Sequence, residues 1–269
     1  MDYTFSKVNA ETIPLAPREA MQFGRALNRV LHNIVRSNPR YGPVHMAKID
    51  IADGFYRVWV QIADIPKLGV ALPVAPGQQP LVAFPLALPM GWVESPPYFT
   101  TLTETICDLS NARLASHTYC GQPHRLEHLA ATRPSDEVSQ ERTARPRHAT
   151  TVETHLLPVG TVDIYVDDFL LLAQTQHQRT RVMRAALESI DDVFRPLAPD
   201  DPPFRKDPTS AKKLMKGDAA WSTRKRLLGW DLDTVNMTLN LPPHRLDRLR
   251  EVLSWLAPPR KRLPISQWH

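Results

Sequence analysis

Apolar residues recur every three or four positions in four stretches of the chain, and this spacing predicts helices. The first stretch, residues 18–35, follows Pro17 and places these residues on one face: Ala20, Phe23, Leu27, Val30, Leu31 and Ile34. A second helix is expected to begin with Ser95 as its N-cap and to run to about Arg113, because the prolines at 96 and 97 suit a first turn. A third follows residue 173 with an apolar face of Met183, Ala186, Leu187, Ile190 and Phe194, and a fourth covers about 243–256.

Short apolar runs bounded by proline and glycine predict strands. Such runs cover residues 44–51, 59–62 and 68–72, and a turn is expected at Pro76-Gly77. The runs 162–166 and 169–173 are separated by Asp167-Asp168 alone, which predicts a hairpin with two carboxylates at its tip. A second hairpin is expected near residues 227–241, after a proline-rich loop over 195–208. Strands and helices in this mixture predict an α+β fold.

Residues 118–155 differ from the rest of the chain in composition, since they are rich in Arg, Glu, His, Thr and Pro and show little periodicity. This composition predicts an exposed, disordered insertion. Four histidines lie in it: His124, His128, His148 and His155. Their spacings fit no tight metal-ligand pattern, so a metal site there is the less favoured alternative.

Composition limits the class of protein. The chain has 269 residues, of which 42% are hydrophobic and 23% charged, so it is long enough for a substantial globular core. It has no run of 18 apolar residues and no secretory signal pattern at its start, so neither a membrane span nor secretion is expected. Two cysteines, Cys107 and Cys120, cannot form a disulfide framework, and a reducing intracellular compartment is expected. The 26 prolines predict many turns and short elements.

Charge is distributed unevenly along the chain. Residues 205–269 carry 14 Lys and Arg against 6 Asp and Glu, whereas the rest of the chain is slightly acidic. A basic end of this kind is typical of a protein that binds a polyanion. A solvated basic surface without a partner explains the charge equally well.

The candidate chemistry rests on three aspartates. Asp50 ends one predicted strand, and Asp167 and Asp168 occupy the tip of a predicted hairpin whose strands are strongly apolar. Two adjacent aspartates are most often an ordinary solvated turn. If Asp50 lies beside them on a rigid scaffold, their mutual repulsion requires a cation, and oxygen ligands favour Mg²⁺. Two ions about 4 Å apart could then support phosphoryl transfer.

Three segments in order carry a resemblance to a known family. They are Asp50-Ile51-Ala52-Asp53-Gly54-Phe55-Tyr56, the Leu88–Phe99 segment with Leu-Pro-x-Gly and Ser-Pro-Pro-x-Phe, and Tyr165-Val166-Asp167-Asp168. Together they resemble the reverse transcriptase family of retroelements and retroviruses, and the surrounding sequence is most similar to retrotransposon-derived genes. Leu227-Leu228-Gly229-Trp230 also resembles the primer-grip hairpin of that family. The resemblance extends over about residues 1–260, apart from the 118–155 insertion.

The resemblance implies a right-hand polymerase palm, with an antiparallel sheet packed on helices, partial fingers and a truncated thumb. Residues 1–117 would form the partial fingers and the first part of the palm. Residues 156–241 would complete the palm with its catalytic and primer-grip hairpins, and 242–269 would begin the thumb. The family's upstream fingers segment and the remainder of its thumb are expected to lie outside this chain.

The resemblance also implies a role for each matching residue. Asp50, Asp167 and Asp168 would be catalytic, and two Mg²⁺ or Mn²⁺ ions would be held by these aspartates with the backbone of Ile51. The nucleotide site would comprise Ile51, Ala52, Asp53, Gly54, Phe55, Met90 and Gly91, with Phe55 favouring deoxynucleotides. Lys212 and Lys213 are both candidates for the general acid. The template and primer would contact Ser95, Pro96, Phe99, Tyr165, Leu228, Gly229 and Trp230.

The implied function is an RNA-directed DNA polymerase domain that transfers a nucleotide from a dNTP to a primer 3′-hydroxyl. Its expected partners are an RNA or DNA template with primer, a dNTP and other parts of a polyprotein, with no membrane. The alternative is a catalytically inactive remnant that still binds nucleic acid. A generic metal-dependent phosphotransferase is less favoured, because the chain has no Gly-x-x-x-x-Gly-Lys-Ser/Thr loop.

Overall fold

The structure is a computed structural model that describes residues 3–4, 6–132 and 153–256. Its centre is an antiparallel sheet of three strands: β1 (His45–Asp50), β4 (Gly160–Tyr165) and β5 (Asp168–Ala173). The spatial order is β1-β5-β4, so β5 lies in the middle. Its run Phe169-Leu170-Leu171-Leu172 is fully buried, as expected for a strand covered on both faces.

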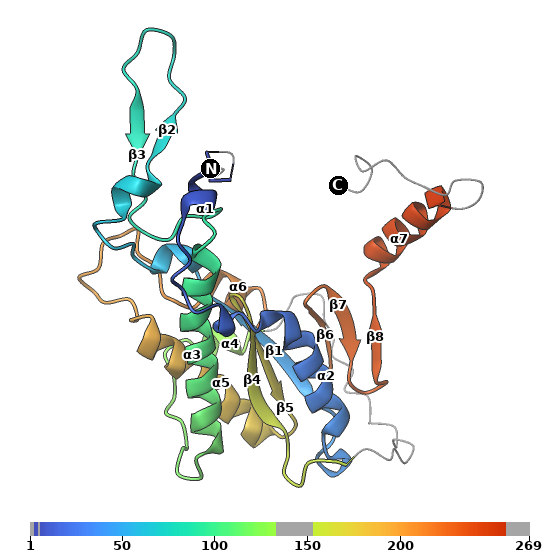
Figure 1. Ribbon diagram of the computed structural model, residues 1–269. Coiled ribbons are helices and arrows are strands. Elements are labelled where there is room, and N and C mark those ends of the chain that lie inside the picture. Colours follow the sequence, from blue (N-terminus) through green and yellow to red (C-terminus); the bar gives the residue numbers. More distant parts are fainter. Residues whose placement is uncertain (1–2, 5, 133–152, 257–269) are drawn as a thin grey trace.

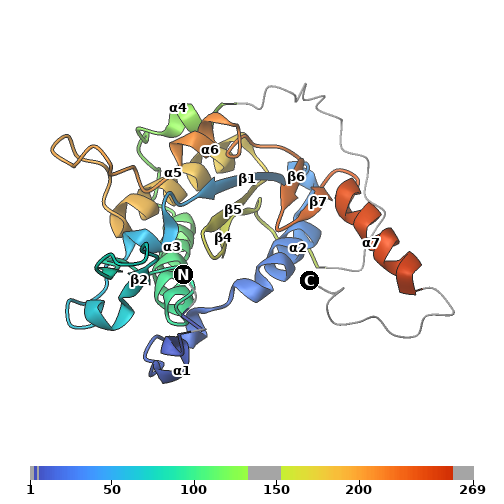
Figure 2. The same ribbon diagram turned by 90° about the horizontal axis from the view of Figure 1, so that it is seen from above.

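Helices cover one face of this sheet (Figures 1 and 2). Helix α3 (Ser95–Ala115) and helix α5 (Gln176–Val193) pack on each other and on β4. Their apolar residues share a core with alternate strand residues, since a strand turns every second side chain to the same face. Members of this core include Ile49, Phe99, Ile106, Phe169, Leu171, Met183 and Leu187.

The opposite face is covered by helix α2 (Ala26–Arg36) and a second small sheet. That sheet consists of β6 (Arg224–Leu227), β7 (Trp230–Asp233) and β8 (Thr238–Asn240) in this order. The two residues between β6 and β7, Leu228 and Gly229, both have positive φ, as a type I′ hairpin turn requires. The second core formed here includes Val30, Met46, Leu170, Leu172, Leu227 and Leu232.

The outer edge of β1 is paired with a segment that comes much later in the chain. Met46 exchanges two backbone hydrogen bonds with Ser222, and the Lys48 amide donates to the Asp218 carbonyl at 3.1 Å. At the end of the strand, the Ser210 amide donates to the Asp50 carbonyl at 2.9 Å. This later segment contains the short helix α6 (Ala211–Met215), which is thereby held beside the end of β1.

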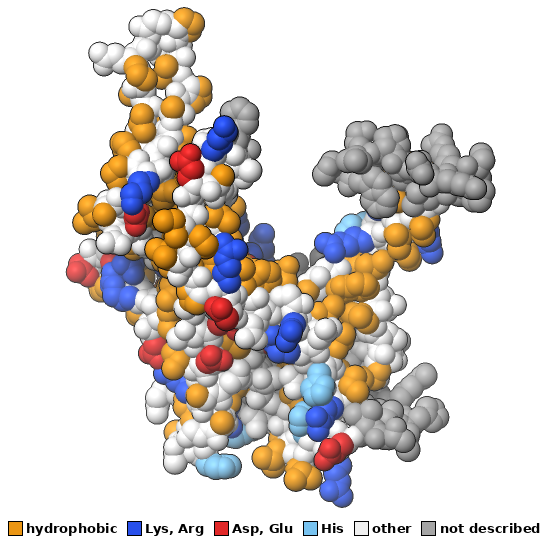
Figure 3. All heavy atoms as spheres, in the orientation of Figure 1, with side chains coloured by type: hydrophobic (Ala, Val, Ile, Leu, Met, Phe, Trp, Pro, Cys, Tyr) orange, Lys and Arg blue, Asp and Glu red, His pale blue; other side chains and the backbone are white. Residues whose placement is uncertain are grey.

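Two projections extend from the body in Figure 1. One is the hairpin of β2 (Val70–Leu72) and β3 (Leu81–Ala83), and the other is helix α7 (Pro243–Leu256). Figure 3 shows an open hollow between them, with hydrophobic side chains gathered along the hairpin. Smaller elements are the helices α1 (Val8–Glu11) and α4 (Glu127–Ala130), with five 3₁₀ turns in the described part of the chain.

The α+β class is confirmed, and several local predictions need correction. The helix expected over 18–35 begins only at Ala26, and two 3₁₀ turns, Arg18–Ala20 and Phe23–Arg25, precede it. Gly24 disfavours a continuous helix there. The strand expected over 59–62 is reduced to a single bridge between Trp59 and Ala87. Ser95 is not an N-cap but the first helical residue, and its hydroxyl donates to the Pro89 carbonyl at 2.7 Å.

Residues 118–132 were expected to belong to a disordered insertion, but in the structure they pack against α5. Leu126 and Ala130 join the main core. Residues 133–152 of the expected insertion, and residues 257–269 of the expected thumb, lie outside the described residues. Among the helices of the described residues, none is long and apolar enough to cross a membrane.

Candidate active site

The candidate site begins with Asp50, the last residue of β1. Asp50 is 1% exposed, and neither carboxylate oxygen accepts a hydrogen bond from a backbone, hydroxyl or amide group. A buried carboxylate without hydrogen bonds is costly unless a cation lies near it. Asp50 therefore marks a position at which positive charge is required.

The other two aspartates lie where the β4–β5 hairpin turns. Asp168 is the first residue of β5 and lies opposite Asp50 in the β1–β5 register, so both side chains are on one face of the sheet. The turn itself is Val166-Asp167 rather than the expected Asp167-Asp168. Val166 has a φ of 59°, which is unusual for a β-branched residue. A backbone hydrogen bond of 3.2 Å from Ile51 to the Asp167 carbonyl ties this turn to the end of β1.

Burial and charge both act on Asp167. Burial raises the pKa of its carboxyl group above the ordinary value, and the neighbouring Asp168 charge raises it further. Its own backbone amide and the Lys48 ammonium oppose this shift of the pKa. The hairpin turn thus concentrates negative charge that the protein only partly compensates.

Two lysines supply the positive charge in the structure. The Lys48 Nζ lies 3.4 Å from Asp50 Oδ1 and 3.1 Å from Asp168 Oδ1, so one ammonium bridges both strands. Lys213, from α6, forms an ion pair with the other Asp50 oxygen. Lys212 is exposed instead, so only one of the two candidate general acids reaches the site. Burial and the Lys48 charge lower the pKa of Lys213, although Asp218 opposes this.

A divalent cation was expected at these aspartates, and the donors fit it in their chemistry. Carboxylate oxygens are the hard ligands that Mg²⁺ and Mn²⁺ prefer, and Asp50 and Asp168 present such oxygens close together at two adjacent strand ends. Within residues 3–4, 6–132 and 153–256, however, no three Asp, Glu, His or Cys side chains converge as metal ligands. The ammonium groups of Lys48 and Lys213 instead lie against the carboxylates.

The segment after Asp50 turns away from the sheet in a tight loop. Asp53 and Gly54 both have positive φ, and the Ala52 amide donates to the Pro208 carbonyl at 2.8 Å. Asp53 forms an ion pair of 2.7 Å with Lys206, and both side chains are exposed to solvent. The loop expected to meet a nucleotide thus lies beside the 206–210 segment.

Phe55 was expected to line a nucleotide site. Its ring meets Phe99 edge to face, with centroids 4.9 Å apart, and Phe99 is 1% exposed. Phe99, expected to contact the template, is accordingly a core residue of α3. Phe55 is half-buried against the same core, so it has a packing role at the border of the site.

The segment that leads into α3 is held by the N-terminal residues. Asn9 donates to the Gly91 carbonyl at 3.0 Å and accepts from the Val93 amide at 2.9 Å. Gly91 has a φ of 94°, and Met90 is 61% exposed. Pro96, in the first turn of α3, is half-buried. This segment therefore lies on the α1 side of α3, whereas the aspartates stand on β1 and the β4–β5 hairpin.

Three residues expected at a primer or template, Tyr165, Leu228 and Trp230, lie on the face of the sheet that α2 and β6–β8 cover, which is also the face of Asp50 and Asp168. Tyr165 is half-exposed, and its ring meets that of Phe23 edge to face. Leu228 and Trp230 pack against the second core on either side of Gly229. The Gly229 carbonyl accepts a hydrogen bond of 3.3 Å from Arg245 of α7, which links this hairpin to the last helix.

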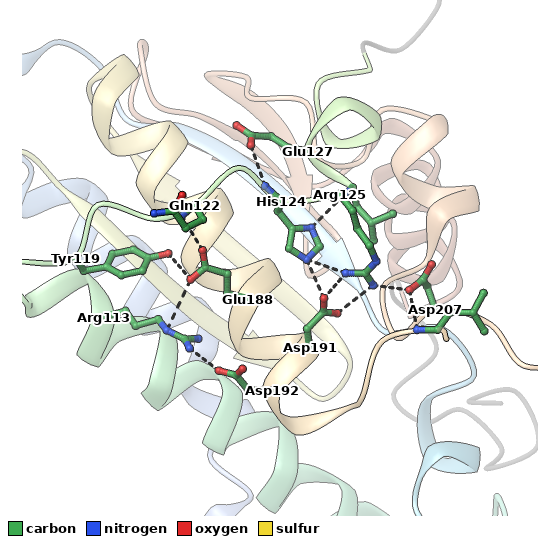
Figure 4. A network of polar contacts seen from close by, with 12 residues as sticks. Arg113, Tyr119, Gln122, His124, Arg125, Glu127, Glu188, Asp191, Asp192 and Asp207 are labelled. Atoms are coloured by element: carbon green, nitrogen blue, oxygen red, sulfur yellow. Dashed lines mark hydrogen bonds and ion pairs between the residues drawn. The ribbon is translucent and has the colours of Figure 1, made fainter. Parts of the chain in front are cut away.

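Sequence reasoning missed a polar network that Figure 4 shows between residues 113–127, helix α5 and the 195–208 loop. Arg125 forms ion pairs with Asp191 of α5 and with Asp207 of the loop. The His124 Nε2 lies 2.9 Å from Asp191. Burial opposes ionisation of Asp191, but hydrogen bonds from His124 and Arg125 outweigh it, so the pKa of Asp191 is lowered.

This network reaches the candidate site through the backbone. The Asp207 and Lys206 carbonyls both accept hydrogen bonds from Arg57, whose Nε also donates to the Ala52 carbonyl. Arg125 therefore fixes the loop that lies against residues 52–57. The only sequence signal was the charge-rich composition of 118–155, which indicated exposure rather than packing.

Comparisons with known proteins give limited information. No family model matches the chain, and no curated protein matches it. Among solved structures, the chain is similar to a foamy viral protease-reverse transcriptase in complex with double-stranded DNA, with 15% identity and a TM-score of 0.49 over 91% of this chain. It is also similar to a foamy viral protease-reverse transcriptase in complex with an RNA/DNA hybrid, with 16% identity and a TM-score of 0.49 over 93% of this chain. This chain spans 29% and 22% of the length of those two chains.

Proposed function

We propose that this chain is a reverse transcriptase-like domain for nucleotidyl transfer from a dNTP to a primer 3′-hydroxyl. One observation carries the proposal: Asp50 and Asp168 lie opposite each other at adjacent strand ends, beside the Asp167 turn, and the buried Asp50 carboxylate is contacted by the ammonium groups of Lys48 and Lys213. The three ordered sequence motifs, two of which meet at this arrangement, support it.

The chain's own residues would do the following in this reaction. Asp50, Asp167 and Asp168 would hold two Mg²⁺ or Mn²⁺ ions, which when bound would stabilise charge on the attacking and leaving oxygens. The exposed Lys206 and the partly exposed Lys213 would bind triphosphate oxygens. Because Lys213 contacts Asp50 and Lys212 is exposed, Lys213 is the better candidate to give a proton to the leaving pyrophosphate.

The test is primer extension on poly(rA)/oligo(dT) by the full chain with Mg²⁺ or Mn²⁺. The matched control is the double variant Asp167→Asn, Asp168→Asn, which removes both hairpin charges with little change of shape. Extension by the wild-type chain and none by the variant is the expected result. Extension that persists in the variant would exclude these aspartates as the catalytic groups.

A second candidate function is nucleic-acid binding without catalysis. The observation that favours it is the arrangement of Lys48 and Lys213, whose ammonium groups already neutralise Asp50 and Asp168. In that case primer extension is absent, and binding of the duplex remains and weakens steeply with salt.

A further inference from the structure

Lys48 stands at the point where the carboxylates of the two strands in the candidate site come together. It lies two residues before Asp50 on β1, so both side chains extend to the same face of the sheet. Its ammonium contacts Asp50 Oδ1 and Asp168 Oδ1 at 3.4 and 3.1 Å. A bridging cation between two carboxylates is the role that a metal ion usually has in such a cluster.

The local charges show why this contact matters. Asp50, Asp167 and Asp168 carry three formal negative charges, and Lys48 and Lys213 return two positive charges. The Asp50 side chain is fully buried, and that of Lys48 is only 22% exposed, so solvent screens the pair weakly. The protein itself therefore leaves one formal negative charge in the cluster uncompensated.

We propose that Lys48 is a built-in counter-cation that competes with divalent metal ions for Asp50 and Asp168. It holds the two strand ends together when no ion is bound, and it must leave at least one carboxylate when an ion binds. This inference rests on the proposed function, and it assigns to Lys48 a positioning role that controls how readily the site is loaded.

The competition follows from elementary electrostatics. A unit positive charge repels a divalent cation in the same cluster, and at an effective dielectric constant of about 20 this repulsion exceeds a tenfold change in affinity at contact distances. The same ammonium stabilises the ion-free protein, because Asp50 would otherwise be a buried charge with one partner fewer. Removing it should thus weaken the ion-free fold and strengthen metal binding.

The first experiment is titration of the full chain with Mn²⁺ alone, followed by calorimetry or electron paramagnetic resonance. The variant Lys48→Met keeps the length of the side chain without its charge, and we expect it to bind Mn²⁺ at least tenfold more tightly than the wild type. Lys48→Arg keeps the charge and should stay within threefold of the wild type. Lys67→Met, at an exposed lysine paired with Asp64, is the matched control and should change nothing.

A second measurement avoids the risk that Lys48→Met fails to fold. In the wild-type chain, amine acylation of Lys48 by an N-hydroxysuccinimide ester is followed by mass spectrometry with and without Mn²⁺, and Lys67 serves as the internal reference. Release of Lys48 from the carboxylates should raise its acylation rate several-fold when Mn²⁺ is present. A rate that stays constant or falls overturns the proposal.

The outcomes separate this inference from the proposed function. If Mn²⁺ binds and the Asp167→Asn, Asp168→Asn variant loses it, but Lys48→Met binds no more tightly, the counter-cation role is excluded and the metal site stands. If neither the wild type nor Lys48→Met binds Mn²⁺, both the metal site and the counter-cation role are excluded.

Discussion

The pKa of the Glu104 side chain is set by the residues around it. It lies on α3 in a groove of about 600 Å³ between α2, α3 and β4, and its Oε1 is buried without a hydrogen-bond partner. Burial raises the pKa of its carboxyl group to about 7. Arg29 of α2 opposes the shift, whereas Asp163 of β4 and Asp108 of α3 add to it. At neutral pH this carboxyl group is therefore about half ionised.

The raised pKa has a defined consequence for stability. Because the folded protein binds the proton more tightly than the unfolded chain, the free energy of unfolding falls as the pH rises from about 4.5 to about 7. Glu104→Gln removes the charged form, so we expect the variant to be more stable than the wild type at pH 8 by on the order of 1 kcal/mol, after allowance for solvent screening. Urea unfolding at pH 5 and pH 8 measures this. A stability difference that is equal at both pH values would contradict the assignment.

Elements depend on contacts that bring distant segments together, and the exposed edge of β4 is an example. Asn111 of α3 acts there in place of a neighbouring strand: its Nδ2 donates to the Val162 carbonyl at 2.8 Å, and its Oδ1 accepts from the Val162 amide at 3.0 Å. Thr161 donates to the same oxygen. One side chain thus satisfies backbone groups that would otherwise form an open sheet edge.

Asn111→Ala leaves the buried Val162 amide without its partner. We expect it to lower the free energy of unfolding by about 2–3 kcal/mol, since an unsatisfied buried donor carries its full desolvation cost. Asn28→Ala, at an exposed position on α2, is the control and should stay within about 0.5 kcal/mol of the wild type. Urea unfolding monitored by circular dichroism compares the two, and equal losses of stability would refute the role of Asn111.

The contact between residues 118–132 and the 195–208 loop also joins two segments that are distant in sequence. Arg125→Met leaves Asp191 and Asp207 without their shared partner. We expect faster amide hydrogen exchange at Ala52 and Ser210. Their hydrogen bonds join residues 50–52 to the segment that follows Asp207, and this segment is no longer anchored by Arg125. Arg125→Lys should retain part of the protection. Unchanged exchange at both amides in Arg125→Met would show that the loop is held by other contacts.

These elements also show what could be predicted from the sequence. Helical spacing of apolar residues predicted α5 and α7, and short apolar runs predicted β1 and the β4–β5 hairpin. That Asp50 lies beside the hairpin aspartates was a hypothesis from the sequence. Only the register of β1 and β5 shows that Asp50 is directly opposite Asp168. The partners Lys48 and Asn111 carried no local signal, and the composition around Arg125 indicated exposure rather than packing. Their roles depend on which segments meet, and sequence spacing does not encode that.

At the scale of the whole molecule, part of the positive charge of residues 205–269 lies on helix α7. Helix α7 stands apart from the body as one of the two projections beside the hollow in Figure 3, and it carries Arg245, Arg248 and Arg250. Arg245 also links α7 to the Gly229 turn. Three of the 14 basic residues of 205–269 therefore lie on a projecting element, where Arg248 pairs with Glu251 and Arg250 with Asp247.

If this projection binds phosphates, the double variant Arg245→Ala, Arg248→Ala weakens duplex binding uniformly across sequences. The slope of log affinity against log salt should fall in magnitude by about 2, because each arginine that is removed leaves one phosphate with its counterion. Fluorescence anisotropy between about 50 and 200 mM salt measures this slope. Arg195→Ala, in the exposed ion pair with Asp201, serves as the control. An unchanged slope in the double variant would exclude α7 from the interface.

The pairing of β1 with residues 208–222 has a consequence for how the chain acquires its structure. Met46 pairs with Ser222, and Asp50 with Ser210, so the site cannot be completed until most of the chain has been synthesised. Contacts so far apart in sequence slow folding, because a long loop must close before they form. Until then β1 exposes an unpaired edge that can join other strands. A ribosome-bound chain that ends before residue 208 is therefore expected to need a chaperone, and release of the later segment should end that need.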